Sequence, residues 1–136
     1  MKRLAVPLVL LLAAAVFAAA GAAHEKKSSD DRGVMSAIAR APLKTRDWQN
    51  PFEGRPDSIA AGKKLYLEHC AHCHAKDARG RGQAVNLRLP GVQNATAGEL
   101  VWFLGNGNLW RGMPSWSGLP IQRRWQIVSY LKSLRR

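Results

Sequence analysis

Cysteine and histidine are scarce in this sequence of 136 residues, which contains two of the former and four of the latter. The two cysteines, Cys70 and Cys73, lie close together in the chain. A zinc site at this pair would need further ligands at other places in the fold, and the sequence offers none. A thioredoxin-like Cys-x-x-Cys motif needs a βαβ context, and no stretch has the pattern of a β-strand. The sequence therefore argues against both kinds of site.

The start of the chain has the pattern of a secretory signal peptide. Lys2 and Arg3 precede an apolar run over residues 4–17, and small residues then offer cleavage sites after Ala20 or Ala23. No cysteine lies near these sites, so an acylated lipoprotein is excluded. The alternative is an uncleaved anchor, for which the apolar run is short. The pattern predicts a protein exported to the periplasm.

Acidic residues are the other shortage. The chain has nine Asp and Glu against 21 Lys and Arg, which gives a formal net charge of +12. A basic surface suits nucleic acid, an anionic membrane or an acidic protein partner. An exported protein meets no genome, so we expect no nucleic acid, and a membrane only if the signal segment is uncleaved. Either the basic residues are simply solvated, or some of them steer an acidic redox partner.

The sequence after the signal divides into an extension and a domain. Residues 1–23 are the predicted signal peptide, and residues 24–55 are an N-terminal extension that we expect to be partly disordered. Its leader has nothing to bury, a short helix over residues 34–43 follows, and the chain is irregular from Thr45, where prolines and a glycine interrupt it. Residues 56–136 contain the regular hydrophobic patterns and form the predicted domain.

The first helix of the domain is expected directly after Pro56. Asp57 or Ser58 is a good N-cap, and the helix runs to His69 with apolar residues at helical spacing. A glycine inside a helix costs about 1 kcal/mol relative to alanine. Gly62 therefore suggests that another backbone comes close at that point.

Two further helices are expected in the second half of the chain. Thr96 and Glu99 form a capping box that opens a short helix, and Gly105 ends it. The last helix begins at Pro120 and runs to about Leu134 with one apolar stripe. Because no stretch predicts a strand, we expect an all-α domain.

Residues 70–74 are Cys-Ala-His-Cys-His, and a Cys-x-x-Cys-His run is the attachment signal of c-type haem. Two thiols one helical turn apart can add to the two vinyl groups of a haem, and the next residue then places an imidazole under the iron. We expect one haem c, bound covalently through Cys70 and Cys73, with His74 as the proximal ligand. A porphyrin would also supply apolar contact to a small core, so we expect little stable structure without it.

The sixth ligand of the iron must come from the opposite face of the haem. The other three histidines are poorly placed for this: His24, His69 and His72. We expect the last two to be exposed. Met35 lies in a weakly patterned segment, whereas Met113 stands between a glycine and a proline that can hold its thioether in place. A lone methionine is most often core packing, but the motif and the lack of competitors favour Met113 as the axial ligand.

Residues 56–136 resemble the class I cytochrome c family in more than this motif. Gly62 stands eight residues before the first haem cysteine and Tyr66 four before it. Further similarities are a glycine-rich loop, a late Met-Pro pair and aromatics in the last helix: Gly80, Gly82, Met113, Pro114, Trp125 and Tyr130. The resemblance implies a class I fold in which the N- and C-terminal helices cross around one covalently bound haem, with Gly62 against Tyr130. Segments near the end also resemble small bacterial periplasmic cytochromes.

One position departs from the family's pattern. Family members often carry a proline two residues before the leucine that follows the glycine-rich loop, and its carbonyl accepts the Nδ1–H of the proximal histidine. If Leu87 is that leucine, Val85 stands in the place of the proline. Any backbone carbonyl can accept this bond, which fixes the orientation of the ring. The bond is therefore expected, and its acceptor is open.

The haem pocket needs a wall and groups near the propionates. We expect large apolar side chains to form the wall: Leu87, Leu100, Trp102, Phe103, Trp110 and Trp116. Four polar or N–H-bearing residues are candidates to meet the propionates: Asn106, Asn108, Trp110 and Arg111.

These features imply a carrier of single electrons rather than an enzyme. It would take electrons from a dehydrogenase or an upstream carrier and pass them to an acceptor such as an oxidase. Ligation by His74 and Met113 fills the coordination shell, and the thioether favours Fe(II). Two alternatives stay open. One is a dedicated haem subunit of a periplasmic dehydrogenase or oxidase complex. The other is a ligand-binding or peroxidatic haem protein whose Met113 leaves the iron easily.

Overall fold

The structure, a computed structural model, describes residues 31–135. The predicted signal peptide, its cleavage sites and His24 lie outside the described residues. Within residues 31–135 no helix is both long and apolar enough to span a membrane. The predictions of export and cleavage therefore stay predictions.

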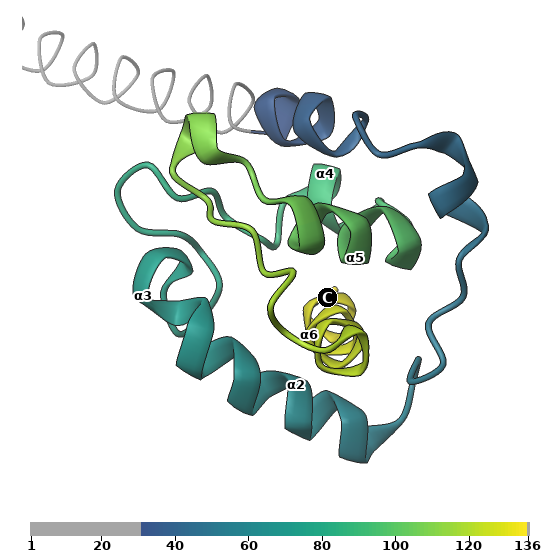
Figure 1. The fold of residues 1–136 in the computed structure, drawn as a ribbon. Helices are drawn as coiled ribbons and strands as arrows, with labels where there is room; N and C mark the ends of the chain where they lie inside the picture. The colour runs from purple at the N-terminus through teal and green to yellow at the C-terminus, as the bar shows by residue number, and fades with distance from the viewer. Residues whose placement is uncertain (1–30, 136) are drawn as a thin grey trace, which may run out of the picture. The chain divides into compact units, whose positions relative to one another are not determined.

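Helices are the regular elements of the described residues, and no strand occurs among them. Residues 31–38 are helical and precede η1 (Leu43–Asp47), α2 (Pro56–His69), α3 (Ala71–His74), α4 (Pro90–Gln93), α5 (Ala97–Asn106), η2 (Leu109–Arg111) and α6 (Ile121–Ser133). α6 packs against both α2 and α5 (Figure 1). The predicted all-α fold is confirmed.

α2 and α6 cross at Gly62. A Cβ atom at this position would overlap the carbonyl oxygen of Gln126 and would lie 3.1 Å from the Cβ of Tyr130. The ring of Tyr66, one turn further along α2, is fully buried and lies 5.2 Å from the ring of Tyr130, centroid to centroid. The predicted contact between Gly62 and Tyr130 is confirmed.

The helix boundaries differ from the predictions in places. The N-cap of α2 is Arg55 rather than Asp57 or Ser58, because Pro56 has a preset φ and no N–H to satisfy, which suits the first helical position. In the same way, Pro90 begins the four-residue α4.

α5 begins as predicted and ends later. Thr96 and Glu99 form both hydrogen bonds of the capping box. The helix does not stop at Gly105 but continues to Asn106, and its C-cap is Gly107 with a φ of +68°. A Cβ at Gly107 would lie 2.5 Å from the carbonyl oxygen of Pro114, so this position needs glycine both for its backbone conformation and for space.

The end of the extension contains two short helical segments. Residues 31–33, which the sequence places in a disordered leader, are helical, and η1 extends to Asp47, whereas residues 48–55 are irregular as predicted. The carbonyl oxygen of Thr45 would overlap a Cβ built on Gly98, and the Cβ of Trp48 would lie 2.8 Å from it. A glycine in the first turn of α5 therefore lets η1 approach the helix closely.

Hydrogen bonds connect the same segment to the rest of the domain at three places. Arg46 Nε donates to Glu99 Oε1 at 2.8 Å, and the amide of Gly91 donates to Asp31 Oδ1 at 2.6 Å. The side-chain amide of Asn50, which is buried, donates to Ser129 Oγ at 2.9 Å. Because such buried polar groups need their partners, the end of the extension contributes to the packing of α4, α5 and α6.

Replacing Glu99 with glutamine should lower the free energy of unfolding at pH 7 by about 1 kcal/mol, because charge-assisted hydrogen bonds become neutral ones. Burial raises the pKa of Glu99, but the hydrogen bonds of its carboxylate to Thr96 and Arg46 outweigh burial and lower the pKa below its ordinary value of 4.5. The carboxylate therefore stabilises the fold above pH 4.5, and this contribution is lost as the pH falls through the folded-state pKa.

Chemical denaturation as a function of pH checks this, with Glu53→Gln as the control because Glu53 is exposed. The difference between wild type and Glu99→Gln should be constant above about pH 5 and shrink below it. A difference that persists undiminished to pH 3 would contradict the assignment.

Candidate haem site

The Cys-x-x-Cys-His run forms a tight helical turn at the end of α2. Cys70 caps α2 and opens α3, and its carbonyl oxygen accepts from the amides of Cys73 at 3.2 Å and His74 at 2.9 Å. Both thiols are free: Cys70 is half-buried and Cys73 is exposed. Burial, with a smaller contribution from Cys73, raises the pKa of the Cys70 thiol to about 11. The half-buried thiol is therefore neutral at pH 7, and both sulfur atoms are available for thioether bonds.

The imidazole of His74 is held by one backbone hydrogen bond. Its Nδ1–H donates to the carbonyl oxygen of Val85 at 3.0 Å, which identifies the acceptor that the sequence left open. Burial lowers the pKa of His74 below 6.5, although the hydrogen bond with Val85 acts in the opposite direction. A neutral ring whose Nδ1 carries the proton keeps a lone pair on Nε2, which is the form that binds a metal.

The loop after His74 brings the Val85 carbonyl into position. Gly80, with a φ of +85°, turns so tightly that a Cβ there would overlap the carbonyl oxygen of Ala84 and lie 2.9 Å from the carbonyl carbon of Val85. Its amide donates to the carbonyl of His74 at 3.0 Å. Tyr66 Oη donates to the carbonyl of Ala75 at 2.6 Å. The tyrosine at the helix crossing thus also fixes the chain directly after the histidine.

Met113 ends a short closed turn. The backbones of Asn108 and Met113 exchange two hydrogen bonds, of 2.8 and 3.1 Å, and η2 fills the span between them. Gly112 adopts the left-handed conformation, with a φ of +75°. The side chain of Met113 is half-buried against the hydrophobic core, as is that of Cys70. Because these hydrogen bonds constrain the backbone, they limit the positions that the Met113 thioether can take.

Some of the predicted pocket residues are placed differently. Leu87, Phe103 and Trp116 are half-buried against the core, as a pocket wall requires. Trp110 lies on η2 and is 96% exposed, and its place in the wall stays a prediction. Leu100 is buried within the core itself.

The two histidines near the motif also differ from each other. His72 is exposed as predicted. His69 is not, because its side chain is only 22% exposed and its ring lies 5.3 Å from that of Trp116. The contact connects the end of α2 to the segment that follows Met113, which no local sequence pattern indicates.

These donor groups fit a haem c. Two free thiols lie one turn apart, the imidazole is neutral and oriented, and a thioether is held on a short turn. Together with the all-helical architecture and the crossing at Gly62, they define the class of protein as a c-type cytochrome domain.

The comparison with protein families agrees with this class. Residues 57–131 match the family described as "Cytochrome C oxidase, cbb3-type, subunit III". The chain belongs to this family, which is a class I-like family of c-type cytochromes. No curated protein and no solved structure matches the chain significantly.

Membership establishes the general activity. The domain binds haem c covalently and serves haem-based electron transfer with redox proteins, and proteins of this family are generally not enzymes. The match begins at residue 57, so the packed segment 31–55 is outside it.

Proposed function

We propose that the protein is an exported monohaem cytochrome that carries single electrons between redox proteins through iron ligated by His74 and Met113. The observation that carries this proposal is the pair of constrained donors. The imidazole is fixed by the Val85 carbonyl at 3.0 Å, and the thioether stands on a turn closed by two backbone hydrogen bonds.

Each of the predicted haem-binding side chains would have a separate role in such a carrier. When bound, haem c supplies a one-electron iron couple. Cys70 and Cys73 tether the group, and His74 is oriented to donate from Nε2. A thioether from Met113 stabilises Fe(II) over Fe(III) and raises the potential. With His74 and Met113 both holding the iron, no site would be left for a substrate, and little would have to rearrange when the iron changes charge.

Replacing Met113 with alanine should abolish the near-infrared charge-transfer band of the ferric protein, which reports methionine bound to iron. The midpoint potential should fall because the soft ligand is lost, and the ferrous protein should bind CO. Absorption spectroscopy and a redox titration measure all three. Met35→Ala is the matched control, because Met35 is more than half exposed, and it should change none of them.

A wild-type protein that lacks the band and binds CO readily would overturn the proposed ligation. The function would then be ligand binding or peroxidatic chemistry at an open iron site, which is the alternative left open by the sequence.

A second candidate function is that of a dedicated haem subunit. The family's description names a subunit of a terminal oxidase, and the extension that precedes the matched residues packs on the domain by contacts of its own. Purification of the native protein from the periplasm decides between them. A free carrier elutes alone, with a mature N-terminus after Ala20 or Ala23, whereas a subunit elutes with a membrane-bound or soluble oxidoreductase.

A further inference from the structure

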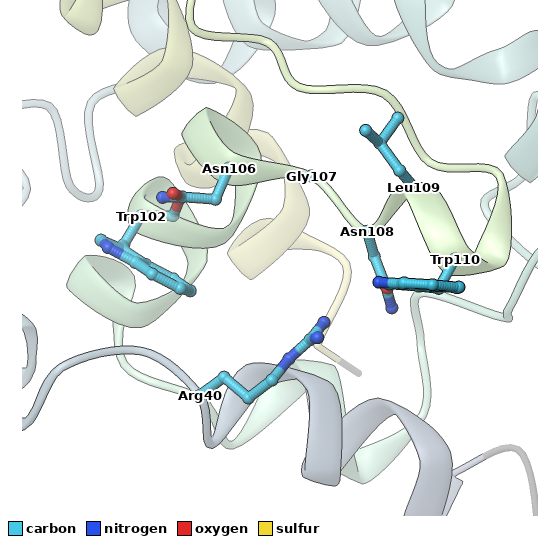
Figure 2. Close-up of a pocket in the computed structure, with 7 residues that line it drawn as sticks. All are labelled: Arg40, Trp102, Asn106, Gly107, Asn108, Leu109 and Trp110. Carbon is cyan, nitrogen blue, oxygen red and sulfur yellow. The ribbon is translucent and has the colours of Figure 1, made fainter.

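A surface cavity of about 280 Å³ lies beside the turn that ends at Met113. Figure 2 shows its seven lining residues: Arg40, Trp102, Asn106, Gly107, Asn108, Leu109 and Trp110. They come from the segment after residues 31–38, from α5 and from η2. Neither the two cysteines nor His74 or Met113 lines it, whereas three of the candidates to meet the propionates do: Asn106, Asn108 and Trp110.

Two large apolar side chains form the rim of this cavity. Leu109 is 76% exposed and Trp110 is 96% exposed. Single exposed apolar residues are ordinary in soluble proteins, but here two neighbours in sequence stand beside a cavity whose far side is another tryptophan, Trp102. Tryptophan at the edge of a pocket is typical of the residues that contribute most to protein–protein binding.

Two arginines lie beside these side chains. Arg40 extends toward Asn108 and Trp110 (Figure 2), and the guanidinium of Arg111 covers Gly33, 3.4 Å from the position of a Cβ there. In the part of the chain that the structure describes, neither arginine takes part in an ion pair. No carboxylate lines the cavity.

The turn that carries Leu109 and Trp110 is the one that ends at Met113. Its two backbone hydrogen bonds join Asn108 to Met113 directly. A protein seated on the turn is therefore within a few residues of the proposed iron ligand.

We propose that Arg40, Leu109, Trp110 and Arg111, here called the η2 face, dock an acidic electron-exchange protein, with one protruding carboxylate of the partner entering the cavity to meet Arg40. This inference rests on the proposed function. A second copy of this chain is disfavoured because both faces would be positive. A concave cavity lined by an arginine and two asparagines also receives a protruding side chain better than it receives a lipid surface. A small apolar contact surrounded by charged residues is typical of short-lived protein complexes.

Stopped-flow electron exchange tests the η2 face with a defined probe, a small blue-copper protein that has a carboxylate-rich docking face. Trp110→Ser should slow the second-order rate constant by about tenfold. The double variant Arg40→Glu with Arg111→Glu should slow it by at least about tenfold at low salt and flatten its dependence on ionic strength. The matched control is Lys63→Glu with Lys64→Glu, which makes the same change of charge at exposed positions of α2 and should cost less than about threefold.

The outcomes separate the proposal from its competitors. An equal loss in the α2 control would mean that net charge alone steers the probe, and the η2 face would be rejected. A changed haem spectrum or midpoint potential in Trp110→Ser would place the residue in the haem pocket and also reject it. Unchanged electron-exchange rates in these variants would also reject the η2 face as a docking surface. If the variants had at the same time lost binding to anionic phospholipid vesicles, the face would be assigned to a membrane.

Reaction with a small neutral quinone distinguishes failure of the docking surface from failure of the proposed function. If the wild type exchanges electrons with the quinone but not with the copper protein, or exchanges with the latter at a rate independent of salt, the acidic partner is refuted. If it exchanges electrons with neither, the proposed carrier function fails instead.

Discussion

Replacing Cys70 and Cys73 together with alanine should yield a chain that holds no covalent haem and has lost most of its helical circular dichroism. Several apolar side chains around the site are only half-buried against the core, among them Leu87, Phe103 and Trp116. Without a porphyrin their open faces meet water, at about 1–3 kcal/mol for each side chain. A small domain is stable by only about 5–15 kcal/mol, so the loss of several such contacts is enough to unfold it.

Far-ultraviolet circular dichroism of the purified chains measures this effect, and His72→Ala is its control. His72 lies between the two cysteines and is exposed, so this variant should keep its haem and its full helical signal. If the double cysteine variant were as helical as the wild type, the helices would be held by their own core, and the haem would contribute little to folding.

Replacing Gly62 with alanine should lower the free energy of unfolding of the haem-loaded protein by about 2 kcal/mol. The new Cβ would overlap the carbonyl oxygen of Gln126 and lie 2.6 Å from its carbonyl carbon. Backbone atoms of a packed helix cannot rotate away, so α2 and α6 must separate, and overpacking of this kind costs about 3 kcal/mol. The better helix propensity of alanine recovers about 1 kcal/mol.

Gly118→Ala provides the comparison for this prediction. A Cβ at Gly118 would have no atom within 4 Å, and its backbone φ is not in the left-handed region. Denaturant unfolding of this variant should differ from the wild type by no more than about 0.5 kcal/mol. Equal stability of the two alanine variants would show that the crossing at Gly62 is not tightly packed.

The close approach at Gly62 could be predicted because its signal is a local anomaly, whereas the identity of its partner, the last helix, was implied only by the resemblance to class I cytochromes c. A glycine in the middle of α2 has a cost that only close packing explains, and the structure puts the Gln126 carbonyl there. Gly98 makes the same kind of contact with Thr45. The sequence does not predict this contact, because a glycine in the first turn of a helix is common. In addition, the segment around Thr45 has no hydrophobic periodicity that would indicate a packed element.

The candidate donors follow from covalent spacing and elimination, whereas their surroundings do not. The spacing of Cys70, Cys73 and His74 predicts thioether attachment and an axial imidazole, but the exposure of Trp110 could not be predicted. A tryptophan is buried only if another element covers it, and in the fold η2 carries it outward to 96% exposure. Sequence patterns describe one segment at a time, and this exposure depends on several.

The sequence by itself therefore determined the cofactor chemistry, the helical class and the crossing point, since each is encoded by neighbours within one or two turns. Only the tertiary structure decided that Val85 is the acceptor for His74, because that choice depends on the tight turn at Gly80. It also decided that the end of the extension packs on α5, and that Arg40 reaches a cavity beside Trp110. Such contacts join residues far apart in the chain, and their free energy exists only once the helices have assembled.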